Sequence, residues 1–248
     1  MPEGDARSLR GVTCVIPAYN EREAIGPTCD AVLEALRQTG APYELLVVDD
    51  GSVDGTAEVA GVHGARVMSH PVNAGYGRSL KSGIDAASHD TIVITDADGT
   101  YPVDRIPELL TAYDSGISMV IAQRQGAAYR ESVLKAPLRI LLKMLVEFVS
   151  GNRVPDVNSG LRVFSRETVR SYYPHLCDTF SFTSSLTLAY LMSGRFVQFI
   201  PMSYARRIGK TKVRLFRDSL RSLQYVFQQA IYYNPLKIFF TLAASCFL

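Results

Sequence analysis

Short apolar runs that alternate with helix-like segments constrain the fold of this chain more than any other feature. Five such runs are candidate strands, at residues 12–17, 43–50, 65–70, 91–98 and 117–123. Between them, residues 24–36 and 106–113 carry apolar side chains at the spacing of amphipathic helices. Repeated strand–helix units predict an α/β fold, in which a largely parallel sheet carries helices on both faces.

The second half of the chain has a less regular pattern. It predicts a helix over 132–150, a loop over 152–160, a helix over 180–192 and a strand over 195–201. A chain of 248 residues can build a core without disulfides. Its four cysteines are far apart in the sequence, which argues against a secreted disulfide framework and favours a reducing, cytosolic environment.

Polar segments follow four of the five apolar runs. These segments are PAYNE (17–21), DDGSVDGT (49–56), DADGTY (96–101) and QRQG (123–126). Ligands of open α/β sheets bind outside the carboxyl ends of the strands. We therefore expect one crevice to collect all four segments.

The segment DADGTY has the composition of a metal site. Asp96 and Asp98 are alternate residues at the end of a predicted strand, so both side chains can point at one cation. Hard cations such as Mg²⁺ and Mn²⁺ bind one or two carboxylates together with substrate phosphates. Acidic residues at strand ends also cap helices, so the neighbouring motifs decide between the two interpretations.

The order of the motifs resembles family 2 glycosyltransferases of the GT-A fold. The matching segments are PAYNE, VVDDGSVDGT (47–56), NAGYGRSLKSG (73–83) and DADGTY. The resemblance implies a GT-A sheet and a Mg²⁺ or Mn²⁺ cofactor held by Asp96 and Asp98. It also implies that the nucleotide is bound by Pro17, Tyr19, Glu21, Asp50 and Asp96. In the alternative interpretation, Tyr19 lies in the core and the acidic pair at 49–50 caps a helix.

Downstream segments narrow the resemblance to polyprenyl-phosphate glycosyltransferases, which include dolichol-phosphate mannose synthases. These segments are AQRQG (122–126), DVNSGLR (156–162) and RRIGKTK (206–212). The resemblance implies that Arg124, Arg206 and Lys212 bind phosphates, whereas Arg207 and Lys210 are expected in solvent. The implied reaction is inverting transfer of a sugar from a UDP- or GDP-linked donor to polyprenyl phosphate, at the cytoplasmic face of the membrane.

Two positions depart from the family pattern. Thr100 stands where some members carry an amide residue, so a water is expected between this side chain and the metal. Ser184 and Ser185 occupy a segment where many members have an acid. This leaves Asp156 as the carboxylate predicted near the acceptor, where it would orient sugar or phosphate. Asp98 is predicted to act in catalysis through the metal that it binds.

The C-terminal region combines positive charge with apolar character. Residues 205–221 carry seven basic residues against one acidic residue, which favours an anionic phosphate or lipid as partner over nucleic acid. Apolar residues at helical spacing then predict an amphipathic helix that lies in a membrane interface or packs on the core: Phe216, Leu220, Leu223, Phe227 and Ile231. The uncharged run 238–248 is shorter than the roughly 20 residues that span a bilayer, so it is predicted to begin a truncated membrane segment.

The predicted organisation is a catalytic domain over 1–212, a juxtamembrane helix over 213–234 and the start of a transmembrane segment over 235–248. Expected partners are the nucleotide-sugar, the polyprenyl phosphate and membrane lipids, and a homo-oligomer is left open. Two other functions remain open at this stage. One is a family 2 transferase with a soluble or polysaccharide acceptor, and the other is a noncatalytic nucleotide-binding scaffold at a membrane.

Overall fold

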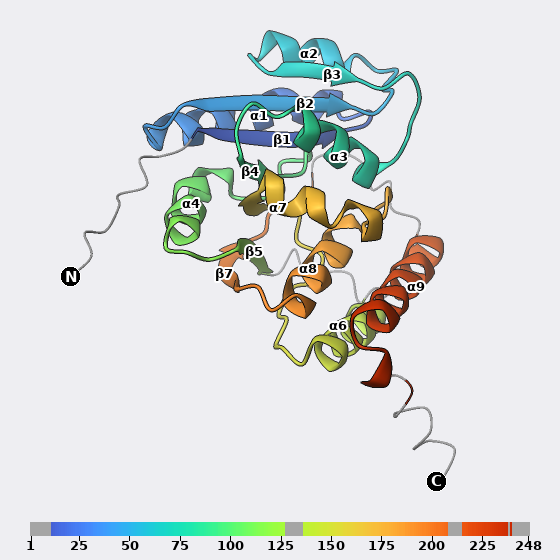
Figure 1. The fold of residues 1–248 in the computed structure, drawn as a ribbon. Helices are drawn as coiled ribbons and strands as arrows, with labels where there is room; N and C mark the ends of the chain where they lie inside the picture. The colour runs from blue at the N-terminus through green and yellow to red at the C-terminus, as the bar shows by residue number, and fades with distance from the viewer. Residues whose placement is uncertain (1–10, 127–135, 208–214, 238, 240–248) are drawn as a thin grey trace, which may run out of the picture.

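A computed structural model describes residues 11–126, 136–207, 215–237 and 239, and its centre is a seven-stranded sheet (Figure 1). The strand order is β3–β2–β1–β4–β6–β5–β7. The strands are β1 (Val12–Ala18), β2 (Tyr43–Asp49), β3 (Arg66–Ser69), β4 (Thr91–Ile94), β5 (Met119–Gln125), β6 (Arg162–Ser165) and β7 (Val197–Ser203). Only β6 runs antiparallel to its neighbours in this sheet. The prediction of a mixed, largely parallel sheet is confirmed.

Helices cover both faces of the sheet, because both faces of the central strands are apolar. Cys14 and Ile16 of β1 pack in one buried cluster, and the intervening Val15 packs in another. The first cluster includes α1 (Arg22–Gln38), α2 (Thr56–Val62) and α4 (Ile106–Asp114). The second includes α3 (Tyr76–Ala86), α7 (Arg166–Ser171) and α8 (Phe182–Met192). Short 3₁₀ turns, η1 (Val103–Arg105) and η3 (Tyr173–His175), precede or follow these helices.

The structure differs from the sequence prediction at two strands. The fourth strand ends at Ile94, whereas the apolar run predicted a strand to residue 98. Strand β6 was not predicted, because it is only four residues long and begins with the charged Arg162. Because β6 is antiparallel to β4 and β5, its first residue lies beside the carboxyl ends of these two strands.

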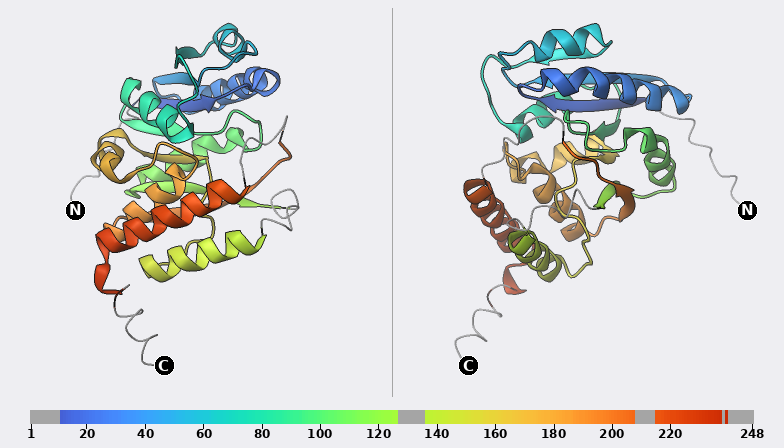
Figure 2. Two further views of the ribbon diagram at one scale, coloured as in Figure 1. Left: turned by 90° about the vertical axis from the view of Figure 1, so that its right-hand side faces the viewer. Right: turned by 180° about the vertical axis from the view of Figure 1, so that it is seen from behind.

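Two further helices form an outer layer beside α8. Figures 1 and 2 show α6 (Ala136–Ser150) and α9 (Leu215–Tyr233) side by side. A third apolar cluster joins them to α8, with Val146 of α6, Leu188 of α8 and Val226 of α9 all fully buried. The predicted helix near the C-terminus therefore exists, and it packs on the protein along one side.

The apolar face predicted for this helix is divided in the structure. Leu223 packs against the third cluster, whereas Phe227 and Ile231 are 48% and 50% exposed. Nothing is described for the side chains of residues 215–222. Val226 and Ala230 form the buried side of α9 instead, because they pack against α6 and α8.

Large apolar side chains remain exposed on this outer layer. On α6 they are Ile140, Leu141, Met144 and Phe148, and on and after α9 they are Phe227, Ile231, Tyr232, Leu236 and Phe239. Within the described ranges, no helix has both the length and the apolar character that crossing a bilayer requires. Most of the predicted membrane segment, residues 238 and 240–248, lies outside those ranges, so the proposed domain division stays a prediction.

Candidate active site

The loops after β1 and β2 are tied together at the carboxyl edge of the sheet. The backbone N–H of Glu21 donates to Oγ1 of Thr56 (2.9 Å), and the N–H of Asn20 donates to Oγ of Ser52 (2.9 Å). Asn20 adopts a positive φ of 51°, and its side chain accepts from the N–H of Val53. The structure thus brings PAYNE and DDGSVDGT together, as predicted from the strand-end pattern.

Asp50 holds the loop that follows β3. Its carboxylate accepts from the N–H groups of Ala74 (2.9 Å) and Gly75 (2.8 Å), and Nδ1 of His70 lies 2.7 Å away. The side chain is 5% exposed. The Asp50 carboxylate therefore fixes the backbone of the loop that leads into the N-terminus of α3.

Asp96 and Asp98 lie in the turn after β4. Because the strand ends at Ile94, strand alternation does not bring the two side chains together, and this part of the metal argument is wrong. Each carboxylate is instead fixed by a neighbouring hydroxyl. Tyr76 donates to Oδ1 of Asp96 (2.9 Å), and Thr100 donates to Oδ1 of Asp98 (2.6 Å).

Burial raises the pKa of Asp96 to about 6, and the nearby negative charge of Asp98 adds to this effect. The hydrogen bond from Tyr76 and the positive charges of Arg124 and Arg207 oppose it only in part. A carboxylate whose pKa is raised in this way has too little positive charge nearby to offset its desolvation. A cation would be stabilised there.

A glycine of the DVNSGLR segment allows this carboxylate to approach the backbone. A Cβ atom on Gly160 would lie 2.7 Å from both carboxylate oxygens of Asp96, closer than any side chain allows. The N–H of Gly160 donates to the hydroxyl of Tyr101 (2.6 Å). The loop before β6 therefore forms one wall of the Asp96 site.

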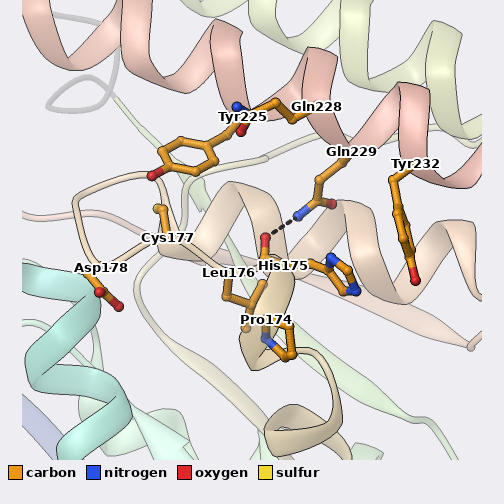
Figure 3. A pocket seen from close by; sticks show the side chains of 9 residues that line it. All are labelled: Pro174, His175, Leu176, Cys177, Asp178, Tyr225, Gln228, Gln229 and Tyr232. Atoms are coloured by element: carbon orange, nitrogen blue, oxygen red, sulfur yellow. Dashed lines mark hydrogen bonds between the residues drawn. The ribbon is translucent and has the colours of Figure 1, made fainter.

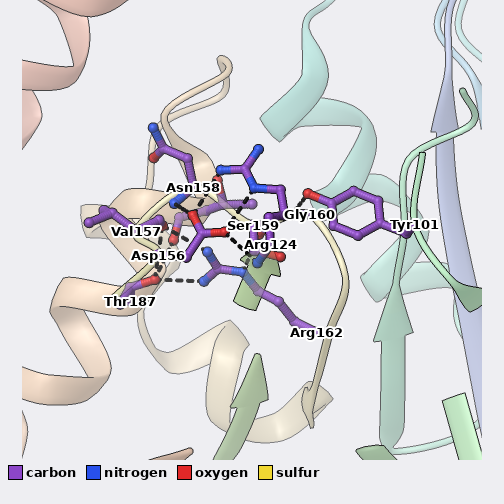
Figure 4. Close-up of polar contacts among 10 residues, drawn as sticks. Tyr101, Arg124, Asp156, Val157, Asn158, Ser159, Gly160, Arg162 and Thr187 are labelled. Carbon is purple, nitrogen blue, oxygen red and sulfur yellow. Dashed lines mark hydrogen bonds and ion pairs between the residues drawn. The ribbon is translucent and has the colours of Figure 1, made fainter. Parts of the chain in front are cut away.

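Arg124 and Asp156 form a bidentate ion pair, drawn in Figure 4. Nε of Arg124 donates to Oδ2 of Asp156 and Nη2 donates to Oδ1, both at 2.8 Å. Burial alone would raise the pKa of Asp156, but the charge and hydrogen bonds of Arg124 hold it below its usual value. With 2% of its side chain exposed, Asp156 directs its carboxylate at Arg124.

Arg162 is fully buried beneath the same loop. Its guanidinium donates to the carbonyls of Val157 and Ser159 and to the hydroxyl of Thr187 (Figure 4). Burial lowers the pKa of Arg162 to about 10. This residue was not predicted as part of the site, although a basic residue within the run LRVF is a signal for a paired internal charge.

The basic segment after β7 contributes a residue that was expected in solvent. Nη2 of Arg207 lies 2.5 Å from Oε1 of Glu21, and Nη1 lies 3.4 Å from Oδ2 of Asp98. The interpretation of Arg207 as a solvated residue is therefore wrong. The spacing of RRIGKTK could not reveal this contact, since its partners lie 186 and 109 positions away in the sequence.

The structure gives the burial of three other predicted site residues. Pro17 is buried in β1, Tyr19 is half-buried and Arg206 is exposed. Lys212 lies outside the described residues. Ser184 and Ser185 are buried within α8, where the Ser184 hydroxyl donates to the carbonyl of Ser181.

A separate cavity of about 350 Å³ lies between α9 and the segment around η3 (Figure 3). The rings of His175 and Tyr232, which both line it, are in contact with their centroids 4.1 Å apart and their planes tilted by 35°. The side chain of Gln229 donates to the carbonyl of His175. This cavity is lined by none of the predicted site residues.

The donor set at Asp96 and Asp98 fits a divalent cation only as a partial site. One oxygen of each carboxylate accepts a hydroxyl, and the second oxygen of Asp98 lies 3.4 Å from Arg207, so a cation would have to compete with that guanidinium for it. Among the described residues, no group of three or more His, Cys, Asp or Glu side chains is placed to hold a metal. A cation here would take its remaining ligands from substrate phosphates, as Mg²⁺ sites commonly do.

Comparison with known proteins supports the resemblance seen in the motifs. The model of the family described as "Glycosyl transferase family 2" matches residues 13–173. A dolichyl-phosphate hexose transferase of Haloferax volcanii is 30% identical over 201 residues, covering 80% of this chain and 85% of that protein. An undecaprenyl-phosphate 4-deoxy-4-formamido-L-arabinose transferase of Serratia proteamaculans is 28% identical over 191 residues, covering 70% of this chain and 57% of that protein. The chain thus spans less than two thirds of the length of the Serratia relative.

Solved structures show the same fold. Glucosyl-3-phosphoglycerate synthase from Mycobacterium tuberculosis, in complex with Mn²⁺, UDP and glucosyl-3-phosphoglycerate, has a TM-score of 0.70 and 24% identity. The match covers 89% of this chain and 80% of that one. Another structure of that enzyme, with Mg²⁺ and UDP, has a TM-score of 0.66 and covers 89% of this chain and 79% of that one.

Proposed function

This chain belongs to glycosyl transferase family 2, and we propose that it transfers a sugar, with inversion, from a nucleotide-sugar to the phosphate of a polyprenyl lipid. The observation that carries the transferase activity is the pair of Asp96 and Asp98 at the carboxyl edge of the sheet, where Asp98 is buried and its Oδ2 lies 3.4 Å from Nη1 of Arg207. Negative charge develops on the leaving nucleoside diphosphate during transfer, and a cation held by these carboxylates would offset it.

The carboxylates are proposed to hold Mg²⁺ or Mn²⁺. Asp96 and Asp98 supply hard oxygen ligands, and the raised pKa of Asp96 indicates a need for positive charge. Such an ion would neutralise charge on the departing diphosphate. Tyr76 and Thr100 keep both carboxylates in position through their hydroxyl groups.

The nucleotide is proposed to lie along the loops after β1 and β2. Pro17, Tyr19, Glu21 and Asp50 are positioned by these loops, and Asp96 would reach the ribose. The hydrogen bonds between the two loops support this assignment, because they hold the loops in one arrangement. Asp50 would act mainly by fixing the loop at Ala74 and Gly75.

On the acceptor side, Arg124, Arg206 and Lys212 are proposed to bind phosphate. Asp156 is better described as a positioning residue for Arg124 than as a group that touches substrate, because its carboxylate receives two hydrogen bonds from that guanidinium. The polyprenyl phosphate already carries a negative charge, so the attack requires no strong base.

The acceptor is inferred from the relatives and from the outer helices. The printed names of the Haloferax and Serratia relatives contain dolichyl phosphate and undecaprenyl phosphate. The large apolar side chains exposed on α6 and α9 suit an interface with lipid, which supports the proposal that the catalytic domain lies at a membrane. The cytoplasmic face is part of this proposal. A soluble acceptor would need no such surface.

A donor and acceptor screen tests this proposal. Radiolabelled UDP- and GDP-sugars are incubated with polyprenyl phosphate in detergent, and label in the organic phase is measured. We expect transfer, and a strong loss of transfer with near-normal donor binding in the double variant Arg206→Ala plus Lys212→Ala. The control variant Arg37→Ala plus Arg170→Ala, which removes two exposed basic side chains from other helices, should retain full activity. Transfer to water-soluble acceptors alone would contradict the lipid acceptor.

A further inference from the structure

Arg207 occupies an unusual position for a residue in a basic segment. Its guanidinium lies between two carboxylates from different loops, Glu21 after β1 and Asp98 after β4. Both carboxylates are nearly buried, with side chains 9% and 7% exposed. An arginine therefore stands beside the carboxylate that is proposed above to hold the metal.

The guanidinium is incompletely bonded in this position. Nε of Arg207 is buried, and within the described part of the chain no atom accepts a hydrogen bond from it. A guanidinium carries five N–H donors in a planar fork that matches phosphate oxygens. The buried Nε–H is thus a donor that no described atom satisfies, and an anionic group that binds beside the guanidinium could accept from it.

The contacts of Arg207 are also of a kind that can be exchanged. One nitrogen contacts each of two carboxylates, the contact to Asp98 is 3.4 Å long, and the side chain is 29% exposed. Arg124, by contrast, is 15% exposed and bonds one carboxylate through two parallel 2.8 Å hydrogen bonds. Arg207 can leave its partners at a lower cost than Arg124 can.

We infer that Arg207 is a diphosphate-binding residue, which the carboxylates of Glu21 and Asp98 hold in place until the donor arrives. This inference rests on the proposed function. With a divalent cation and a nucleoside diphosphate both bound, Asp98 would hold the cation, and Arg207 would donate its N–H groups to phosphate oxygens. The exchange leaves the net charge of the site unchanged, because the two positive charges of the cation match the two negative charges on the diphosphate of a nucleotide-sugar.

The exchange predicts opposite effects on two ligands. In the absence of nucleotide, Arg207 competes with the cation for Asp98, so Arg207→Ala should bind Mn²⁺ about fivefold more tightly, the scale of a partly exposed charge contact. With Mn²⁺ present, the same variant should bind UDP or GDP about tenfold or more weakly, since it loses charge-assisted hydrogen bonds to phosphate. A merely structural residue would weaken both ligands.

Two binding measurements on the full chain test this. Free Mn²⁺ is counted by electron paramagnetic resonance without nucleotide, and nucleoside diphosphate affinity is measured by calorimetry at saturating Mn²⁺. Arg207→Lys keeps the positive charge but loses the planar guanidinium. Its affinity for the nucleoside diphosphate should lie between those of the unsubstituted protein and Arg207→Ala. Arg105→Ala, which removes an arginine paired with Glu108 on the surface, is the matched control and should change neither affinity.

The outcomes separate this inference from the proposed function. Unchanged or weaker Mn²⁺ binding by both Arg207 variants, with normal binding by the unsubstituted protein, overturns the exchange alone. Absence of Mn²⁺ binding by the unsubstituted protein overturns both the exchange and the proposed metal site. Tighter Mn²⁺ binding with weaker nucleotide binding supports the exchange, even if no sugar reaches a polyprenyl phosphate and the proposed acceptor fails.

Discussion

Two regions of the site pair carboxylates with arginine in different ways. At the turn after β4, Asp98 lies 3.4 Å from the partly exposed Arg207, which Glu21 also contacts, and Asp96 accepts a hydrogen bond from the neutral Tyr76. Before β6, a single carboxylate, Asp156, receives a bidentate fork from Arg124 and lies near the buried Arg162. The first region is short of positive charge, and the second has it in surplus.

The pKa values express this difference. Burial acts on both regions, yet it raises the pKa of Asp96 to about 6, whereas arginine charge brings the pKa of Asp156 below its usual value. A carboxylate that lacks a counter-charge is suited to bind one, and a carboxylate that already has one is suited to hold structure. We therefore separate the site into a ligand-binding region, where a cation would bind, and a supporting region, where Asp156 positions Arg124 for its proposed phosphate.

Removing the supporting carboxylate should have the largest effect on folding. Asp156→Asn leaves Arg124 mostly buried without its counter-charge, so we expect the free energy of unfolding to fall by about 3–5 kcal/mol. Asp98→Asn is the matched control, because it keeps an oxygen for Thr100 and relieves repulsion with Asp96, and it should cost less than about 1 kcal/mol. Urea denaturation measures both values. Equal losses in the two variants would remove the distinction between the regions.

Removing the ligand-binding carboxylate should have the larger effect on catalysis. Asp98→Asn should lower the transfer rate by about 100-fold or more, because it removes a proposed ligand of the cation that would offset the charge of the leaving group. Chelation by EDTA should abolish transfer, and Mg²⁺ or Mn²⁺ should restore it. Rates are measured with saturating donor and acceptor. Full activity in excess EDTA contradicts the metal site.

Acid should affect the two regions in opposite directions. Because the pKa of Asp96 is raised in the folded chain, protonation below about pH 6 should weaken Mn²⁺ binding by about tenfold per pH unit. The same shift means that the folded state binds more protons here than the unfolded state, so this group makes the metal-free protein more stable as pH falls from above 6 toward 4. Asp156 has a lowered pKa, so its contribution is present above its unfolded value near 4 and is lost below it.

Mn²⁺ titrations and thermal unfolding between pH 7 and 4 measure these effects. Asp96→Asn is the control, which should bind Mn²⁺ weakly and show no such pH dependence around 6. A Mn²⁺ affinity that is constant from pH 7 to 5 in the unsubstituted protein would show that Asp96 is not a ligand.

The parts of the site that depend on local sequence could be predicted, and those that depend on distant contacts could not. Strand ends followed by polar segments predicted where Glu21, Asp50 and Asp98 would gather, because this follows from parallel sheet geometry. The contact between Arg207 and Glu21 joins residues 186 positions apart, so no spacing rule could reveal it. Tyr76 was part of a recognised motif, yet its bond to Asp96 depends on how α3 packs against β1 and β2.

The single antiparallel strand has a consequence for the growing polypeptide. Strand β6 inserts between β4 and β5, both of which are synthesised before it. A chain still on the ribosome at residue 150 already contains Asp96, Asp98 and Arg124, but neither the carboxylate that holds Arg124 nor the glycine that receives Asp96. The central gap in the sheet closes only when residues 156–165 have emerged. Assembly of the site therefore comes late in translation, and truncation before β6 should yield a chain with most of the motif residues and no organised centre.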